Sequence, residues 1–147
     1  MAEKTIIIID ACCHILEAHK KGRTGFGKCA CGILAIEPNG VEHEMGKYLG
    51  EMTVPESEFR GLLYALEEAI GITTGDLEIR MDSELVVRWM TGKNRIHAKH
   101  IRPLLDEAKK LERRYRSVDY FHHNRDTQMA KRADNIADKE YKKHQGK

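Results

Sequence analysis

The sequence TIIIIDAC, at residues 5–12, carries the pattern that decides the fold. Its four successive isoleucines form a continuous apolar run, which is typical of a strand buried on both faces of a sheet. The run ends at Asp10, whose ionised carboxylate is costly in a buried strand unless it is paired or binds a metal ion. The alternative is a strand end at which Asp10 reaches solvent, and the residue alone does not decide between the two.

Two further strands are predicted downstream of this run. The segment CACGILAI at residues 29–36 is again apolar, and residues 41–52 supply a third strand after the turn PNG at residues 38–40. Asn-Gly is a strong signal for a tight hairpin. We therefore expect the first three strands to form an antiparallel meander, with a polar loop over residues 14–28.

The rest of the chain alternates between helical and strand patterns. Residues 53–56, TVPE, have the form of a capping box with an early proline, and the helix that they start ends at Gly71. Later patterns predict a strand over 77–81, helices over 83–90 and 101–115, a strand near 118–121 and a helix over 130–141. The order βββαβααβα predicts an α/β protein with a mixed five-stranded sheet, helices packed on it and a single domain over residues 1–147.

Composition limits the class of protein. Apolar residues make up 41% of the chain and charged residues 33%, as in a soluble globular protein. No stretch approaches the roughly 18 apolar residues of a membrane span, and the N-terminus lacks a signal-peptide pattern. We therefore expect a cytoplasmic protein without a membrane partner, and a monomer.

The charge divides along the sequence. Residues 37–84 hold twelve acidic and three basic residues, a net charge of −9, whereas residues 91–116 hold nine basic and three acidic residues, a net charge of +6. This division fits a cation site beside a polyanion-binding surface. A solvated helix with an uneven face would give the same pattern, so charge alone does not decide.

Glu58 is placed by the phase of its helix. It lies four and eight residues before Leu62 and Leu66, so it shares their apolar stripe. A first-turn glutamate is also favoured by the helix dipole, but Glu56 accounts for the cap better. Glu58 is therefore expected to face the sheet.

Two more carboxylates lie at the interior edge of separate elements. Asp82 ends a strand before a helix, where it is either an N-cap or a ligand at the sheet edge. Asp134 borders the packed face of the last helix, whereas Asp138 is explained as solvated. With the other two they form a set of oxygen ligands that Mg²⁺ prefers, and two such ions can hold the attacking and leaving oxygens of a phosphodiester.

The four cysteines stand at Cys12, Cys13, Cys29 and Cys31. We expect them to be reduced, because disulfides are rare in the cytosol. With His14 and His19 they offer the ligands of a structural zinc site, but the usual spacing between paired ligands is missing. Buried or partly buried thiols are the favoured interpretation.

The segment GRTGFGKC at residues 22–29 nearly matches a phosphate-binding P-loop. A P-loop opens a helix after a buried strand, and here strand-like residues follow. We therefore set aside a nucleoside triphosphatase, for which ATP hydrolysis would be the discriminating assay.

Four short motifs stand in a specific order along the chain. They are Asp10 after the isoleucine run, EFRGL at residues 58–62, DSELVV at 82–87 and ADNIA at 133–137. In this order they resemble the first-strand aspartate, the helix start, the strand-to-helix junction and the closing helix of the type 1 ribonuclease H family. The element order is also similar over nearly the whole chain.

This resemblance implies a ribonuclease H-like fold and hydrolysis of the RNA strand of RNA–DNA hybrids, with a 3′-hydroxyl product. It implies two Mg²⁺ or Mn²⁺ ions held by Asp10, Glu58, Asp82 and Asp134, with Asp10 as the bridging ligand. The family often adds a histidine before the final helix that helps product release. His123 is the candidate, with His122 beside it, although both are equally explained as surface residues.

The resemblance also implies a surface that binds the hybrid, and this sequence alters it. Residues 11–14, ACCH, replace a glycine-rich stretch, residues 54–57 replace asparagines that contact the minor groove, and Glu84 replaces a glutamine. Glu84 would repel phosphate unless it accepts a hydrogen bond from a 2′-hydroxyl. The expected nucleic-acid-binding residues are Ser83, Glu84, Lys93, Arg95, Lys99, Arg113 and Arg114.

Two alternatives therefore stay open. The first is a non-catalytic module on the same fold that binds hybrids or proteins, since fold does not fix function. The second is a nuclease for another nucleic acid, such as double-stranded RNA or a DNA junction.

Overall fold

The computed structural model describes residues 3–16, 26–124 and 127–145. Within these ranges it contains five strands, four α-helices and a 3₁₀ turn, η2, in the order predicted from the sequence. None of the described helices is long and apolar enough to cross a membrane. The elements are β1 (Lys4–Ile15), β2 (Phe26–Ile36), β3 (Glu42–Thr53), α1 (Val54–Glu68), η2 (Ala69–Gly71), β4 (Asp76–Met81), α2 (Glu84–Met90), α3 (Arg102–Glu112), β5 (Ser117–His122) and α4 (Gln128–Gln145).

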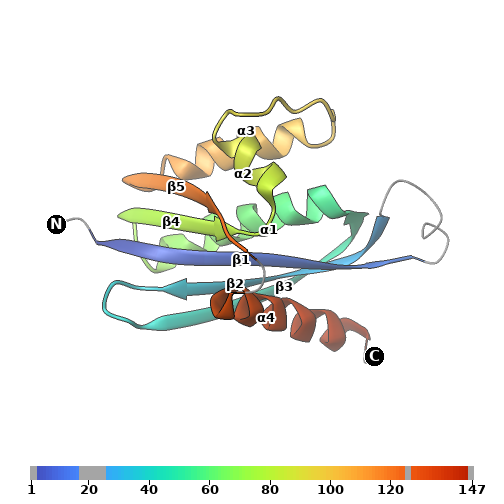
Figure 1. Cartoon of the computed structure of the whole chain (residues 1–147), viewed down its shortest axis with the longest axis horizontal. Coiled ribbons are helices and arrows are strands. Elements are labelled where there is room, and N and C mark those ends of the chain that lie inside the picture. The colour runs from blue at the N-terminus through green and yellow to red at the C-terminus, as the bar shows by residue number, and fades with distance from the viewer. Residues whose placement is uncertain (1–2, 17–25, 125–126, 146–147) are drawn as a thin grey trace.

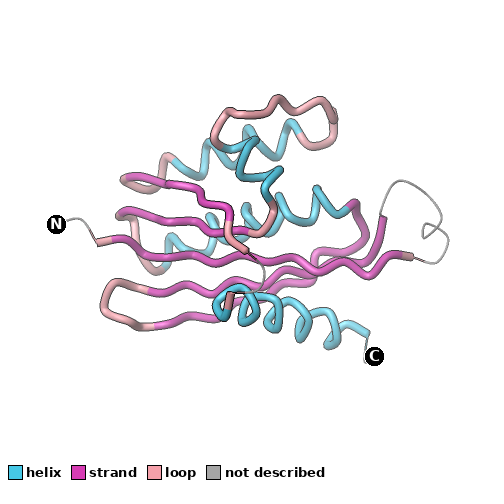
Figure 2. The backbone as a smooth tube through the Cα atoms, viewed as in Figure 1, coloured by secondary structure: helices cyan, strands magenta, loops and turns pink. Residues whose placement is uncertain are grey.

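The strands form one sheet in the order β3-β2-β1-β4-β5 (Figure 2). β1, β2 and β3 pair antiparallel as a meander, whereas β4 pairs parallel with both β1 and β5. At the turn between β2 and β3, Gly40 has a φ of 91° and its N–H donates to the carbonyl oxygen of Glu37 (2.8 Å). Glycine adopts this left-handed conformation without strain. The predicted mixed five-stranded sheet is confirmed.

Helices cover both faces of the sheet, with α1, α2 and α3 on one face and α4 on the other (Figure 1). Because side chains alternate along a strand, the isoleucine run serves both faces. Ile7 and Ile9 pack in the large core beneath α1 to α3, and Ile8 packs with Leu34 and Ala133 beneath α4. The exposed fraction of each of these side chains is at most 1%, so β1 is buried on both faces as predicted.

α4 lies very close to β2. A Cβ atom at Gly32 would stand 2.2 Å from the carbonyl oxygen of Ala133 and 2.5 Å from the backbone nitrogen of Ala137. Glycine in β2 and alanines in α4 therefore let the two backbones approach. This contact fixes the position of α4 against the sheet.

β1 and β2 extend farther than the sequence predicted. β1 continues to Ile15 and β2 starts at Phe26, so both run into the predicted loop of residues 14–28. The sequence did not signal this extension, because Lys, Gly and His are frequent over residues 14–28 and obscure a strand pattern. Residues 26–29 lie within β2, so the second half of the P-loop-like segment is strand and not helix. Residues 22–25 of that segment and His19 fall outside the described residues.

Candidate active site

The centre of the sheet contains a change in strand direction. β1 pairs antiparallel with β2 on one side and parallel with β4 on the other, and the parallel pairing ends at Ile9 and Met81. The next residues along the two strands are Asp10 and Asp82. Ligands of α/β sheets bind beyond the carboxyl ends of parallel strands at such a point.

Two helices, one on each face of the sheet, supply the other two carboxylates. In the first turn of α1, Glu56 pairs with Arg60 (3.0 Å between Oε2 and Nε). Glu58 instead accepts a hydrogen bond from the hydroxyl of Ser83 (3.1 Å between Oε1 and Oγ). The two glutamates thus have different surroundings, as helix phase predicted. Asp134 comes from α4.

The four carboxylates line one cavity of about 550 Å³. The cavity wall is formed by Asp10 on β1, Glu58 on α1, Asp82 directly after β4 and Asp134 on α4, together with the basic Lys131. The structure therefore brings together the four acidic residues that the sequence singled out. Their role as metal ligands stays a prediction.

Electrostatics make this cluster unfavourable without a cation. Burial is the largest cause that raises the pKa of Asp10, followed by a hydrogen bond with Asp134 and the negative charge of Asp82, and the result is a pKa of about 8. A divalent cation would balance these charges, and carboxylate oxygens suit a hard ion. The donor set therefore fits Mg²⁺ or Mn²⁺.

The structure decides between the two interpretations of Asp82. The N-cap of α2 is Ser83, whose Oγ accepts a hydrogen bond from the N–H of Val86 (3.3 Å). Asp82 is therefore not the helix cap, and its side chain lines the cavity. Ser83 is only 7% exposed, so it supports Glu58 and α2 within the protein, and its predicted contact with nucleic acid is untested.

The two candidate histidines lie beside Asp82, at the end of β5. The Nε2 atom of His122 is 3.1 Å from the carbonyl oxygen of Asp82, and the N–H of His123 donates to the carbonyl oxygen of Met81 (2.8 Å). Burial lowers the pKa of His123, while the charge of Asp82 opposes that shift. The catalytic role of His123 stays a prediction.

The predicted nucleic-acid-binding residues on α2 and the loop after it lie near one another in sequence but differ in surroundings. Glu84 pairs with Arg88 one turn later (2.8 Å between Oε1 and Nη2), so part of its charge is balanced. Lys93 and Arg95 line a second cavity of about 760 Å³, and Lys99 is exposed on the same loop. These three bases are placed to attract a polyanion.

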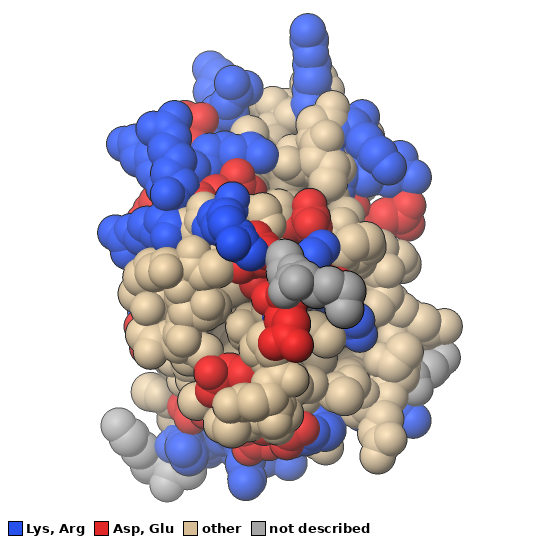
Figure 3. Space-filling view, turned by 90° about the vertical axis from the view of Figure 1, so that its left-hand side faces the viewer, with Lys and Arg blue, Asp and Glu red and all other residues tan. Residues whose placement is uncertain are grey.

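Arg113 and Arg114 lie at the other end of the sheet. They follow α3, and the side chain of nearby Arg116 pairs with Asp76 at the start of β4 (2.6 Å between Nη2 and Oδ2). Six residues of strand, roughly 20 Å, separate Asp76 from Asp82. Figure 3 views this end of the molecule, where Lys and Arg side chains crowd the upper half, toward α3. The structure therefore does not bring these two arginines to the carboxylate cavity.

The prediction of four reduced cysteines is wrong for two of them. Cys13 and Cys29 form a disulfide between β1 and β2, where they are directly opposed in the strand register. The sequence could not reveal this pairing because it depends on the extension of both strands. Cys12 and Cys31 remain free thiols, and Cys31 is fully buried. A zinc site built from all four cysteines is therefore excluded.

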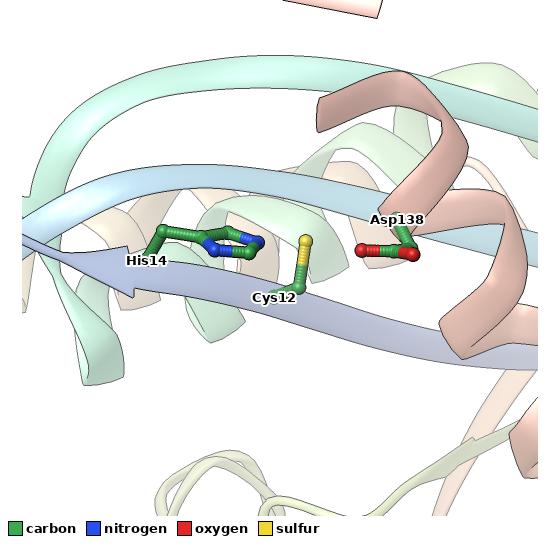
Figure 4. A group of neighbouring side chains, drawn as sticks. All are labelled: Cys12, His14 and Asp138. Atoms are coloured by element: carbon green, nitrogen blue, oxygen red, sulfur yellow. The ribbon is translucent and has the colours of Figure 1, made fainter. Parts of the chain in front are cut away.

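Three potential metal ligands lie together beside the carboxylates; the sequence indicated Cys12 and His14 as possible zinc ligands but not Asp138. The sulfur of Cys12, a ring nitrogen of His14 and a carboxylate oxygen of Asp138 lie within 4.8 Å of one another (Figure 4). Asp138 was expected to be solvated, but it is half-buried. The available signal was spacing, since residues 10, 12 and 14 share one face of a strand and residues 134 and 138 one face of a helix.

This fold and its carboxylate-lined cavity define a ribonuclease H-like protein. The chain belongs to the reverse transcriptase-like family, whose sequence pattern matches residues 19–139. That range contains Glu58, Asp82 and Asp134 and begins after Asp10.

Solved structures share the fold over nearly the whole chain. Ribonuclease H1 from the archaeon Halobacterium salinarum superposes with a TM-score of 0.81 and 24% identity, covering 95% of this chain and 98% of that one. LC11-RNase H1, in complex with an RNA/DNA hybrid, gives a TM-score of 0.81 and 24% identity over 96% and 99%. The N-terminal ribonuclease H domain of Rv2228c from Mycobacterium tuberculosis gives 0.77 and 22% over 96% and 95%. The predicted fold is confirmed.

Mycobacterial proteins are similar in sequence. The bifunctional protein Rv2228c of Mycobacterium tuberculosis is 26% identical over 108 residues, which are 72% of this chain and 30% of that protein. An uncharacterized protein of Mycobacterium bovis matches with the same identity and coverage. The chain thus spans less than a third of the length of these relatives.

Proposed function

We propose that this protein is an endonuclease that hydrolyses the RNA strand of RNA–DNA hybrids with two Mg²⁺ or Mn²⁺ ions. The observation that carries the proposal is the meeting of four carboxylates, from four elements, around one cavity at the centre of the sheet. The shared fold with LC11-RNase H1, which was solved with an RNA/DNA hybrid, supports this substrate class. Asp10, Glu58, Asp82 and Asp134 would hold the ions.

The chain contributes positioning and charge to this reaction. When bound, the ions supply activation of water and stabilisation of negative charge on the scissile phosphate. Asp10 and Asp82 are held by adjacent parallel strands, and the hydroxyl of Ser83 orients Glu58. Lys131 in the cavity wall offers a positive charge to the phosphate. Water forms a bond to phosphorus, the bond to the 3′-oxygen breaks, and the products are a 3′-hydroxyl and a 5′-phosphate.

A second candidate, a module or nuclease with a different nucleic-acid preference, is favoured by the segment before Glu58. Ser57 is fully buried and its hydroxyl donates to the carbonyl oxygen of Val54 (2.6 Å), so it does not offer a contact to a minor groove. Glu84 is held by Arg88 in an exposed ion pair. Hybrid recognition would therefore rely on the basic loop after α2.

The test is a panel of labelled substrates under one set of conditions. An RNA–DNA hybrid, double-stranded RNA, single-stranded RNA and a DNA junction are incubated with the full chain and Mg²⁺ or Mn²⁺, and the product ends are mapped. We expect cleavage of the RNA strand of the hybrid, with 3′-hydroxyl ends. If another nucleic acid of the panel is cleaved in preference to the hybrid, that nucleic acid is the substrate. Binding of the hybrid without cleavage under either ion would contradict the proposal and favour a binding module.

The cytoplasmic location and the monomeric state stay predictions. The Cys13–Cys29 disulfide bears on the first, because disulfides persist mainly in oxidising compartments. Light scattering after size-exclusion chromatography would measure the second.

A further inference from the structure

β1 and α4 run alongside each other and present side chains in matched pairs. Two residues of a strand advance about 6.6 Å and three or four residues of a helix about 4.5–6 Å, so successive pairs stay side by side. The first pair belongs to the carboxylate cluster, and the next two continue away from it. The pairs are Asp10 with Asp134, Cys12 with Asp138, and His14 with Tyr141.

The second and third pairs gather three donors of different kinds. In Figure 4 the sulfur of Cys12 stands between the ring of His14 and the carboxylate of Asp138, and the three donor atoms lie within 4.8 Å of one another. The ring of His14 stacks on Tyr141, with centroids 3.6 Å apart and planes 12° apart. This stacking holds the imidazole in place.

One of the three donors, Asp138, already takes part in an ion pair that a metal ion would have to replace. An oxygen of Asp138 pairs with the ammonium of Lys142 (3.0 Å). The side chain of Lys142 is 74% exposed, and an exposed ion pair of this kind contributes little stability. Asp138 can therefore give up Lys142 for a cation at small cost.

The donor atoms of Cys12, His14 and Asp138 favour a different ion from the one that the four carboxylates favour. Thiolate and imidazole are ligands of Zn²⁺ and other thiophilic cations, whereas Mg²⁺ takes oxygen ligands. A sulfur, a nitrogen and an oxygen donor fill three of the four positions of a tetrahedral Zn²⁺ and leave one open. Cys12 and His14 also line the cavity of the four carboxylates, so the open position is within reach of that cavity.

We propose that Cys12, His14 and Asp138 bind one Zn²⁺ ion at a site separate from the four carboxylates. The disulfide leaves Cys12 and Cys31 as thiols, and Cys31 is fully buried, so Cys12 is the thiol available to an ion from solvent. The site does not depend on the proposed nuclease activity.

The experiment titrates the metal-free full chain, with its disulfide intact, with Co²⁺ as a spectroscopic probe. A thiolate bound to Co²⁺ gives an intense near-ultraviolet charge-transfer absorption, which a carboxylate site does not give. We expect this absorption to saturate at one Co²⁺ per chain and to disappear when Zn²⁺ is added. Zn²⁺ should also protect Cys12 from alkylation, measured by mass spectrometry.

Variants assign the ligands. Cys12→Ser should abolish the absorption, and His14→Ala and Asp138→Asn should weaken the Zn²⁺ affinity at least about tenfold. Glu140→Gln, on the same helix, is the matched control and should bind as the original chain does. His14 is exposed, so its variant tests the site even if a change at Cys12 impairs folding. Absence of the absorption, or Zn²⁺ binding that Asp10→Asn abolishes and Cys12→Ser leaves intact, would overturn the proposal.

Discussion

The two ends of the parallel strand pair β1–β4 hold carboxylates in opposite states, a buried one at Asp76 and a half-buried one at Asp10. At the start of β4, Asp76 accepts hydrogen bonds from Arg116 (2.6 Å to Oδ2) and from Ser117 (2.7 Å to Oδ1), which hold its pKa at about 2. At the end of β1, burial and acidic neighbours raise the pKa of Asp10 to about 8. The carboxylate charge is balanced by a basic partner at one end of the sheet, whereas at the other end it faces further acidic groups.

This difference separates a structural carboxylate from a functional one. Burial of a charge is tolerated when partners balance it, as around Asp76, and the protein gains stability from the ion pair at neutral pH. The charged side chains that shift the pKa of Asp10 are Asp82 and Asp134, which are acids like it. We infer that the acidic surroundings of Asp10 lower the stability of the metal-free protein and form a cation site. Variants at the two ends should therefore have opposite effects on folding and on cleavage.

The largest effect is expected at the cavity end. Asp82→Asn removes one oxygen ligand and should slow hybrid cleavage at least about 100-fold, because charge on the phosphate is then less well stabilised. Single-turnover rates with saturating protein measure this. Asp119→Asn, which removes an exposed carboxylate on β5, is the control and should cleave as fast as the original chain. Equal cleavage rates for Asp82→Asn and Asp119→Asn would show that Asp82 is not part of the active site.

A second effect concerns pH and Mg²⁺. Because the raised pKa of Asp10 leaves a proton on the metal-free cluster below about pH 8, Mg²⁺ must displace that proton. The apparent affinity for Mg²⁺ should then rise about tenfold per pH unit between pH 6 and 8 and level off above it. Calorimetry in buffers with different ionisation enthalpies would count the protons released. No proton release at pH 7 would contradict the account of Asp10.

At the opposite end of the sheet, loss of the Asp76 carboxylate should change the stability of the protein and not its activity. Asp76→Asn should lower the free energy of unfolding at pH 7 and leave hybrid cleavage unchanged. Because the folded-state pKa of Asp76 is about 2, against 3.8 ordinarily, its contribution is complete above about pH 4 and disappears as the pH falls toward 2. Urea unfolding of the original chain and of Asp76→Asn from pH 3 to 7 measures the difference in their free energies of unfolding. A difference that does not shrink with acid would show that the ion pair is not its source.

The smallest effect is expected at Ser83, which both caps α2 and holds Glu58 in place. Ser83→Ala removes the N-cap of α2 and the hydrogen bond to Glu58, so it should cost about 1 kcal/mol of stability. Cleavage should fall less than tenfold, and added Mg²⁺ should restore part of it because Glu58 is only displaced. Ser83→Thr keeps the hydroxyl and should recover both properties. Failure of Ser83→Thr to recover activity would argue against a positioning role.

Local signals were enough to predict most of this fold. The isoleucine run specified a strand buried on both faces, and Thr53 caps α1 as the sequence indicated, with its Oγ1 accepting from the N–H of Glu56 (3.4 Å). Helix phase and strand ends were also enough to find the four carboxylates. These features depend on neighbours within a few residues, which the sequence shows directly.

The features that were missed depend on contacts between distant segments. The disulfide needs the register that pairs Cys13 with Cys29, and that register lies beyond the predicted strand ends. Asp138 is half-buried beside Cys12 because α4 packs closely on the sheet over Gly32. The position of Arg113 at the far end of the sheet follows from the direction of α3, which charge patterning does not reveal.

The most direct test of the central claim is single-turnover cleavage of a labelled RNA–DNA hybrid by Asp10→Asn with Mg²⁺. Hybrid binding, followed by fluorescence anisotropy, and the melting temperature of the metal-free protein at pH 8 serve as controls for recognition and folding. We expect the variant to bind the hybrid and to cleave it at least about 1,000-fold more slowly. It should melt no lower than the original chain, because a destabilising charge is gone. Cleavage by this variant at the rate of the original chain would contradict the central claim.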